Sequence, residues 1–331
     1  MAEIPETMDA AYVDRLGSAD EIRFGRLPVP QTGPTDVLVA VEVVTVNPVD
    51  TFVRSGGYRT STPFPFVIGR DLVGTVVAAG PGAAGFSVGD RVWSNSLGHG
   101  GRQGSFAQYA AVPAERLYHL PDGVDPVQAV GVAHMAATAW LGLFRHGGVR
   151  MGQTVFIGGG AGNVGRAAVS LAVAAGARVI ASAGGADLDR VRAAGAAFVV
   201  DYRDPAATEQ LRAAAPGGVD LHWDTSGHHD FDAALEVLAD GGRLLLTAAG
   251  PQTRVPLPVS AAYTRDVSLV GFAISNAAVT DLADAAVALN QRLADGTLTA
   301  RIADTMPLSQ AADAHRRLGA GGVAGRLILT P

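Results

Sequence analysis

The sequence predicts an α/β protein that joins a β-rich N-terminal region to a doubly wound parallel sheet. In residues 10–120, valine-rich runs alternate with glycines and prolines, as in antiparallel strands joined by turns. After residue 126, apolar strand-like runs alternate with alanine-rich helical stretches, and repeated β-α-β units imply a parallel sheet. The length of 331 residues is enough for two domains, each with its own core.

The β-rich region contains three clear strand signals. Val37–Val46 and Leu72–Ala79 are runs of β-branched and small apolar residues. Gly89 and Asp90 form a turn signal that leads into a third strand, Arg91–Trp93. These segments predict a compact antiparallel domain with long loops.

The alternating region begins with one long helix and continues as strand and helix in turn. The expected helices are Gln128–Phe144, Gly162–Ala175, Leu188–Ala194, Ala206–Ala214 and Phe231–Leu238. The expected strands are Thr154–Gly159, Arg178–Ala183, Phe198–Tyr202, Asp220–Thr225, Arg243–Ala248 and Val267–Ile274. We expect these strands to form the parallel sheet, with Val267–Ile274 last in it.

The C-terminal tail does not continue the alternation of strands and helices. Two helices are expected, Val279–Leu293 and Ser309–Leu318, followed by a final strand, Arg326–Thr330. Because this strand follows the parallel units without fitting their order, we predict that it returns to the first domain.

Composition excludes several kinds of chemistry. The chain has no cysteine, so disulfides, thiol nucleophiles and thiolate metal sites are impossible. All 25 basic residues are arginine, which excludes a lysine Schiff base and a Walker-type phosphate loop. A net charge of −6 disfavours nucleic acid and anionic membranes as general partners. No signal peptide is evident, and the most apolar segment, Ala167–Ala183, is too short to span a bilayer, so we expect a cytoplasmic location.

A glycine motif after the strand Thr154–Gly159 predicts a dinucleotide site. It reads Gly160-x-Gly162-x-x-Gly165 and opens the helix Gly162–Ala175. The first glycine is expected to allow the tight turn, the second the approach of the pyrophosphate, and the third close packing of helix on strand. The helix N-terminus would hold the phosphates. The residues of this motif assigned to cofactor binding are Gly160, Gly162, Asn163, Val164 and Gly165.

The end of the next strand favours NADPH over NADH. Residues Ala181–Gly185 contain no acid to hold the ribose 2′-hydroxyl of NADH, and the small residues leave room for a 2′-phosphate. Asp187 and Asp189 count against this interpretation, because they lie close by in sequence. The residues expected to surround the phosphate are Ser182, Arg190, Tyr202 and Arg203.

Three upstream segments, Val46–Tyr58, Phe66–Val92 and Gly104–Val124, occur in order before the glycine motif. Together these motifs resemble the medium-chain dehydrogenase/reductase superfamily, with the quinone oxidoreductases, or zeta-crystallin-like proteins, as the most similar branch. The resemblance implies a GroES-like catalytic domain over residues 1–127, a Rossmann NADPH-binding domain over 128–274, and a return to the catalytic domain over 275–331. It also implies an active site in the cleft between the two domains.

The same resemblance argues against zinc. Where the zinc alcohol dehydrogenases have their first cysteine ligand, this chain has Asn47, and in place of their Gly-His-Glu it has Gly69-Arg70-Asp71. We therefore predict no metal site. Without a Lewis acid, hydride transfer requires an acceptor that is already electron-poor, such as a quinone or an α,β-unsaturated carbonyl compound.

The predicted catalytic residues lie in one short run. Asn47 offers an amide donor, Asp50 can orient a water or a hydroxyl group, and Tyr58 is a candidate proton donor. The resemblance places their equivalents around the nicotinamide and the substrate. It also assigns cofactor contacts to Thr138, Asn276 and Arg326.

Two alternatives to a quinone or enone reductase remain open. One is an enoyl-thioester reductase acting on an acyl-CoA, for which Arg54, Arg59, Arg70 and Arg102 could form a basic patch. The other is a protein that binds NADPH without turnover. The apolar last strand of the sheet, Val267–Ile274, would leave an edge on which a second copy could pair, so we expect a homodimer.

Overall fold

The computed structural model describes residues 3–250 and 252–331, which divide into two compact units. Unit 1 comprises Met1–His134 and Leu282–Pro331, and unit 2 comprises Met135–Asp281. The observed divisions lie a few residues later than the predicted ones. They fall inside α2 (Pro126–Trp140) and α8 (Val279–Ala294), each of which begins in one unit and ends in the other.

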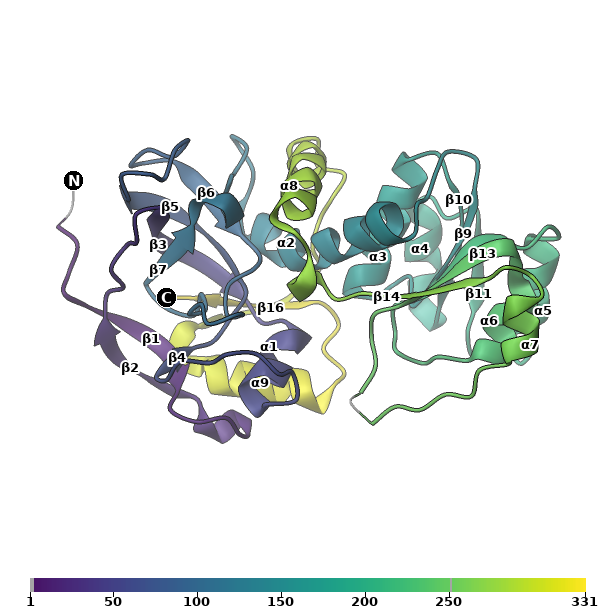
Figure 1. Ribbon diagram of the computed structural model, residues 1–331, viewed down its shortest axis with the longest axis horizontal. Helices are drawn as coiled ribbons and strands as arrows, with labels where there is room; N and C mark the ends of the chain where they lie inside the picture. The colour runs from purple at the N-terminus through teal and green to yellow at the C-terminus, as the bar shows by residue number, and fades with distance from the viewer. Residues whose placement is uncertain (1–2, 251) are drawn as a thin grey trace. The chain divides into compact units, whose positions relative to one another are not determined.

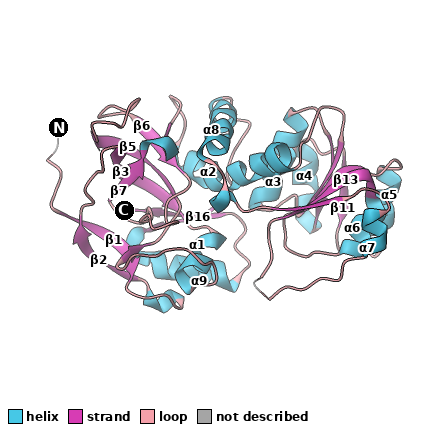
Figure 2. Ribbon diagram, viewed as in Figure 1, coloured by secondary structure: helices cyan, strands magenta, loops and turns pink. Residues whose placement is uncertain are grey.

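Unit 1 is built mainly from β-strands, as expected (Figure 2). Its strands are β1 (Thr7–Val13), β2 (Arg23–Pro28), β3 (Asp36–Thr45), β4 (Phe66–Val67), β5 (Asp71–Ala79), β6 (Arg91–Ser94), β7 (Tyr109–Pro113), β8 (Tyr118–His119), β15 (Ile302–Pro307) and β16 (Arg326–Thr330). Its shorter helices are α1 (Pro48–Ser55) and α9 (Ala311–Ala320). One sheet has the order β2-β1-β4, and the larger one has the order β15-β16-β3-β5-β6-β8, with β7 also paired to β3.

The predicted return of the C-terminal strand is confirmed. β16 pairs antiparallel with β3, so that Ile328 lies opposite Thr45 and Leu329 opposite Val44. The sequence did not indicate β15, which runs parallel to β16 and forms the edge of the same sheet. The last residues of the chain therefore complete the sheet that the first residues begin.

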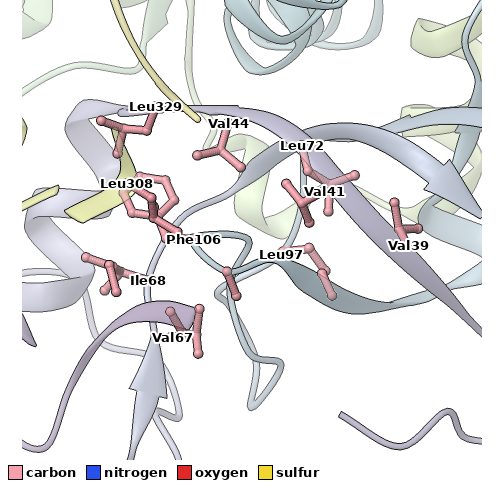
Figure 3. Packing of buried hydrophobic residues seen from close by; sticks show 14 of the residues in the cluster. Val39, Val41, Val44, Val67, Ile68, Leu72, Leu97, Phe106, Leu308 and Leu329 are labelled. Carbon is pink, nitrogen blue, oxygen red and sulfur yellow. The ribbon is translucent and has the colours of Figure 1, made fainter. Parts of the chain in front are cut away.

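The core of unit 1 draws on both parts of the chain. Ile68, Leu72 and Phe106 from the N-terminal part pack with Leu308 and Leu329 from the tail (Figure 3). Each of these side chains is almost completely buried. Removal of this apolar surface from water stabilises the unit and explains why the tail must return.

Unit 2 contains the predicted doubly wound sheet (Figure 1). Its strands are β9 (Thr154–Gly158), β10 (Arg178–Ala183), β11 (Phe198–Asp201), β12 (Val219–Asp224), β13 (Leu238–Leu246) and β14 (Ser268–Gly271). The spatial order is β11-β10-β9-β12-β13-β14, with every pair parallel. The direction of winding changes between β9 and β12, and ligands bind at such switch points.

Helices cover both faces of this sheet. Figure 1 shows α3 (Asn163–Ala174) and α4 (Leu188–Ala193) on one face. On the other face lie α5 (Ala207–Ala214), α6 (Phe231–Val237) and α7 (Val259–Tyr263). β14 is the edge strand that the sequence predicted, but it is shorter than expected because the chain turns into a 3₁₀ segment at Ile274.

The helix that begins at Pro126 differs from its prediction in form. It is α-helical to Trp140 and continues as a π-turn over Leu141–His146. The whole segment is long and apolar enough to cross a bilayer, although 72% of its most apolar window is buried inside the structure. Core helices pass the same test, so this segment is weak evidence for a membrane span.

Candidate functional site

The glycine loop of unit 2 lies at the switch point of the sheet. β9 ends at Gly158, and α3 begins at Asn163 with Gly162 as its N-cap. The first turn of α3 contains no acidic residue, so its positive dipole end is not neutralised by a side chain of that turn. The left-handed conformation belongs to Gly159, at φ +68°, rather than to Gly160. The tight turn assigned to Gly160 is therefore made by its neighbour.

Close packing explains two further glycines of this loop. A Cβ added at Gly165 would lie 2.1 Å from the carbonyl oxygen of Gly159, so the helix could not approach the turn. A Cβ at Gly162 would lie 3.2 Å from the same oxygen. The loop forms a cradle of backbone groups at a helix N-terminus, which fits a pyrophosphate.

Ser182 at the end of β10 holds this loop in place. Its hydroxyl accepts a hydrogen bond from the N–H of Gly159 at 3.1 Å, and its carbonyl accepts one from Gly160 at 2.7 Å. The side chain is 8% exposed. Ser182 was expected to leave room for a phosphate. In the structure it also positions the glycine turn through these two hydrogen bonds.

The fold brings Tyr202 and Arg203 to the end of β10. β10 and β11 are neighbours, and the N–H of Tyr202 donates to the carbonyl of Ala183 at 3.2 Å. A Cβ on Gly184 would lie 2.8 Å from the Tyr202 ring, and one on Gly185 would lie 3.3 Å from Nη2 of Arg203. Two of the residues that the sequence assigned to the phosphate site therefore flank the end of β10, which has no acidic residue.

The nearby charges are largely balanced in pairs. Arg203 donates to both oxygens of Asp201, at 3.0 and 2.7 Å, and this pairing holds the pKa of the Asp201 carboxyl well below its usual range. Arg190 pairs with Asp187 at 2.6 Å. Asp189, which counted against a phosphate, pairs with an arginine at 2.6 Å as well. The acids near this strand end are therefore compensated.

A pocket in unit 2 begins at Ser182 and Tyr202. It lies between the sheet and the pair α5 and α6, and its apolar lining includes Phe156, Val200, Leu211 and Phe231. Its polar lining includes Asp224, His228 and His229. The sequence analysis missed this pocket, although the polar run after the strand Asp220–Thr225 was a signal for a strand-end site.

The turn after β12 is fixed by Asp224. Its Oδ1 accepts hydrogen bonds from the N–H groups of Ser226 and Gly227, at 2.7 and 2.9 Å. The Ser226 hydroxyl donates to the same oxygen at 2.7 Å. The pocket combines apolar walls with a few fixed polar groups, as is typical of cofactor sites.

The remaining cofactor residues predicted in unit 2 lie on separate elements. Thr138 is half-buried on α2, and Asn276 is exposed at the end of a 3₁₀ turn. Asn163 and Val164 open α3, with Asn163 exposed and Val164 half-buried.

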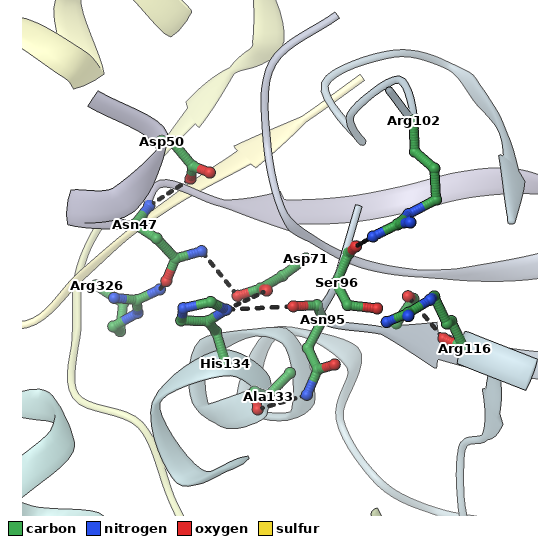
Figure 4. Close-up of polar contacts among 11 residues, drawn as sticks. Asn47, Asp50, Asp71, Asn95, Ser96, Arg102, Arg116, Ala133, His134 and Arg326 are labelled. Atoms are coloured by element: carbon green, nitrogen blue, oxygen red, sulfur yellow. Dashed lines mark hydrogen bonds and ion pairs between the residues drawn. The ribbon is translucent and has the colours of Figure 1, made fainter. Parts of the chain in front are cut away.

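Unit 1 contains a buried polar network around Asn47 (Figure 4). Asn47 precedes α1, and its backbone N–H donates to Oδ2 of Asp50 at 2.7 Å, a capping-box contact. Its side-chain amide donates to Oδ2 of Asp71 at 2.9 Å. Nη2 of Arg326 donates to its side-chain oxygen at 2.7 Å. Asn47 therefore joins three segments that are far apart in the sequence.

This placement corrects the role expected for Arg326. It was predicted to bind a phosphate of the cofactor, but it is 2% exposed, and its guanidinium lies against Asn47 and near Asp71 and Asp50. Its Nη2 pairs with Asn47 and its charge lies near the two carboxylates, while its Nε has no hydrogen-bond partner among the described residues. The sequence showed an arginine in the last strand, but it did not show which way the side chain points.

Burial shifts the proton equilibria of this network. It raises the pKa of Asp50 to about 6, although the Asn47 N–H and nearby arginines oppose the rise. It raises the pKa of Asp71 as well, against the charge of Arg326. His134, whose Nδ1 lies 3.6 Å from Asp71 and 3.2 Å from the carbonyl of Asn95, has its pKa lowered to about 3 by burial and is neutral at pH 7.

Tyr58 lies in a neighbouring cluster rather than in this network. Its ring meets the ring of His99 edge to face, with 5.8 Å between centroids. Burial lowers the pKa of Arg70, just before β5, and the charges of Asp50, Tyr58 and Asp71 oppose this shift. The sequence analysis assigned Arg70 only to a possible basic patch, yet its side chain is 1% exposed.

The His, Asp and Glu side chains of the structure are the candidate metal ligands. Within residues 3–250 and 252–331, no group of three or more such side chains is arranged to hold a metal ion. The chain has no cysteine to complete such a site.

Comparison with known proteins agrees with this architecture. Residues 33–122 match the alcohol dehydrogenase GroES-like domain, and residues 163–290 match the zinc-binding dehydrogenase family. Human quinone oxidoreductase is 27% identical over 333 residues, covering 99% of each chain. A mycobacterial quinone oxidoreductase structure is 31% identical, with a TM-score of 0.85 over 98% of this chain and 100% of that one. A mycobacterial protein solved with NADPH is 31% identical, with a TM-score of 0.84 over 98% and 100%.

Proposed function

Because this chain belongs to the quinone oxidoreductase family of medium-chain dehydrogenases and reductases, we propose that it reduces quinones or related α,β-unsaturated carbonyl compounds with NADPH. Bound NADPH supplies the hydride. The chain itself binds the cofactor through unit 2 and provides polar groups for the acceptor from unit 1.

The glycine cradle of unit 2 is the observation that carries this proposal. The glycine cradle suits a pyrophosphate, and the pocket beside Ser182 suits an adenine. Tyr202 and Arg203 flank the end of β10, which has no acidic residue, and there they would bind the 2′-phosphate. The NADPH complex of a structural neighbour supports the same choice for this chain.

Tyr58 is the proton donor that we propose for the acceptor oxygen. Its phenol is half-buried and lies among His99 and Arg70. Asn47 and Asp50 would act without touching the acceptor, because both are buried, Asn47 donates to Asp50, and the side-chain amide of Asn47 donates to Asp71. Their role in this proposal is to hold α1 and the segment that leads to Tyr58.

The test of this function is NADPH oxidation with a panel of acceptors. We expect turnover with 9,10-phenanthrenequinone and with a simple enone, and little with crotonyl-CoA. Reduction of crotonyl-CoA alone would identify an enoyl-thioester reductase instead. Tight NADPH binding without turnover of any acceptor would identify a binding protein. In a Tyr58→Phe variant we expect kcat to fall about 10²-fold with little change in KM, and an unchanged rate would remove Tyr58 as the donor.

We further propose that two copies pair through β14 and that the enzyme acts in the cytoplasm. β14 is an edge strand of unit 2, and an unpaired edge is a surface on which a second copy can add. Light scattering coupled to size-exclusion chromatography should give the mass of a dimer. The N–H of Phe272 donates to β13, so the N–H of its neighbour Gly271 faces the free side of β14. A Gly271→Pro variant, which removes that donor from the edge, should shift the protein toward the monomer.

A further inference from the structure

Arg70 is a buried cation with unused hydrogen-bond donors. Its side chain is 1% exposed, and within residues 3–250 and 252–331 neither Nε nor Nη2 has a hydrogen-bond partner. A buried guanidinium that leaves donors unpaired is costly, because it has lost its hydration without replacement. Such a group is expected to meet a ligand.

The loop after β6 brings more donors to Arg70. The N–H of Leu97 donates to the carbonyl of Arg70 at 3.2 Å, which ties the loop to the cation. Gly98, at φ +61°, turns the chain back, and its N–H donates to the carbonyl of Gln103 at 3.1 Å. Glycine favours such a left-handed turn, because it has no Cβ. The turn carries His99 at its tip and Arg102 on its returning arm.

Arg102 and Arg70 repel one another. Arg102 is half-buried, its Nη2 donates to the carbonyl of Ser96 at 3.2 Å, and its Nε has no partner in the described part of the chain. Burial lowers the pKa of Arg102, and the charges of Arg116 and Arg70 lower it further. Two guanidinium groups with unpaired donors, on segments joined by a backbone hydrogen bond, favour an anionic ligand.

His99 joins this cluster as a neutral group. Burial and the charges of Arg70 and Arg102 lower its pKa to about 4, so the imidazole is uncharged at pH 7. Its Nδ1 is buried without a partner among residues 3–250 and 252–331. Its ring meets Tyr58, which connects the cationic cluster to the proposed proton donor.

We propose that Arg70, with His99 and Arg102 beside it, binds the acceptor oxygen that becomes anionic during reduction. This inference rests on the proposed function and names the group that stabilises its charged product. The acceptor gains a hydride with its electron pair, NADPH becomes NADP⁺, and the acceptor oxygen takes the negative charge of an enolate or a phenolate. A proton from Tyr58 then gives the neutral product, and water reprotonates Tyr58. A fixed guanidinium at this oxygen lowers the barrier, because it is aimed where charge develops.

The substrate class follows from the site. An acceptor whose oxygen becomes a delocalised anion, such as a quinone or an enone, matches a planar guanidinium that binds oxygen with parallel N–H groups. A simple alcohol does not present such an oxygen. We therefore expect phenolates to bind as analogues of the charged product.

The first experiment uses the unmodified protein with saturating NADP⁺ and 4-nitrophenol, whose yellow form is the phenolate. We expect bound 4-nitrophenol to ionise at a pH at least one unit below that of the free compound, because a cation favours the phenolate. An unchanged or higher ionisation pH would overturn the proposal, and so would the absence of binding at millimolar concentrations.

Substitutions at Arg70 test whether this residue causes the lowered ionisation pH of bound 4-nitrophenol. Arg70→Met should raise the ionisation pH of the bound compound to that of free 4-nitrophenol or above and weaken phenolate binding at least tenfold, whereas Arg70→Lys should retain part of the shift. The control is Arg91→Met, an equal loss of charge at a half-exposed arginine on β6 paired with Glu42. If a folded Arg70→Met protein lowers the ionisation pH of bound 4-nitrophenol as much as the unmodified protein does, the proposal is overturned. If Arg70→Met does not fold, the same comparison is made between Arg70→Lys and the unmodified protein.

This readout separates the two proposals. Ionisation of bound 4-nitrophenol requires no turnover, so a lowered ionisation pH without quinone reduction would remove the proposed function and leave the anion site. Quinone reduction at an unchanged rate in Arg70→Met would remove the catalytic role of Arg70 and leave the function.

Discussion

The two units carry their functional groups in different ways. In unit 2 the candidate cofactor site is made largely of backbone, from a turn at Gly159, a helix N-terminus and a strand end. In unit 1 the polar site is made of side chains from segments that are far apart in the sequence, such as Asn47 and Arg326. A site of the first kind depends on where side chains are absent, and a site of the second kind depends on how they pair.

The largest expected effect is the loss of a charge from the buried network of unit 1. In an Arg326→Met variant, Asn47 loses its donor, and Asp71 and Asp50 lose a nearby cation. We expect the free energy of unfolding to fall by about 3–5 kcal/mol, because a buried pair is left incomplete. Chemical denaturation measures this change. Arg91→Met, which breaks a half-exposed pair with Glu42, should cost less than about 1 kcal/mol, and equal effects in the two variants would contradict the comparison.

The next effect concerns the backbone site of unit 2. In Gly165→Ala the new Cβ would lie 2.1 Å from the Gly159 oxygen, so α3 must move away from the turn. We expect a loss of about 1–3 kcal/mol in stability, together with much weaker NADPH binding. Fluorescence titration with NADPH measures the second part. Gly217→Ala is the matched control, since no atom lies within 4 Å of its added Cβ, and unaltered NADPH binding in Gly165→Ala would argue against the cradle.

A smaller effect tests the choice of cofactor. Arg203→Gln removes a cation beside Gly185 while keeping a side chain of similar length. We expect the Kd for NADPH to rise about tenfold and the Kd for NADH to stay the same, because only NADPH carries the 2′-phosphate. Competition between the two cofactors gives both constants. A similar loss for both would show that Arg203 acts on the fold of the strand end, where it pairs with Asp201.

The smallest effect concerns a buried histidine of unit 1. Within the described chain, neither ring nitrogen of His315 has a hydrogen-bond partner, and its ring packs edge to face on Phe106. His315→Leu should raise the free energy of unfolding at pH 7 by about 1 kcal/mol, because it removes buried polar atoms without partners. Thermal and chemical denaturation should both show this gain, and a loss of stability would indicate a partner for the ring.

The same variant has a pH signature. Burial, and to a lesser extent Arg54, lowers the pKa of His315 to about 3. This pKa lies below the value near 6.5 that a histidine has in the unfolded chain. The contribution of His315 to the free energy of unfolding is therefore fully present above pH 6.5 and is lost as pH falls toward 3. In that window the group contributes a slope of about 1.4 kcal/mol per pH unit. His315→Leu should therefore flatten the acid side of the stability curve, and an unchanged slope would show that His315 is not the group responsible.

Local patterns predicted much of the fold. The strand Arg178–Ala183 was predicted with its observed bounds, and the helix Gly162–Ala175 differs by one residue at each end. The hydrogen bonds and the apolar faces of these elements form between near neighbours, so the order of residue types is enough to indicate them. The strand Ile302–Pro307 was missed, because its pairing with Arg326–Thr330 is a contact between distant segments.

The sequence by itself determined the two-part α/β architecture, the dinucleotide loop and the absence of thiol chemistry, because these depend on local pattern and composition. Only the tertiary structure decided that Ser182 holds the glycine turn, that Arg326 belongs to the network of Asn47, and that Arg70 is a buried cation with unpaired donors. The physical reason is that burial and pairing depend on neighbours from other segments. A sequence does not distinguish an arginine on the surface from an arginine in the core. Packing in the folded protein removes the water around the buried arginine and so changes its hydrogen bonding and its pKa.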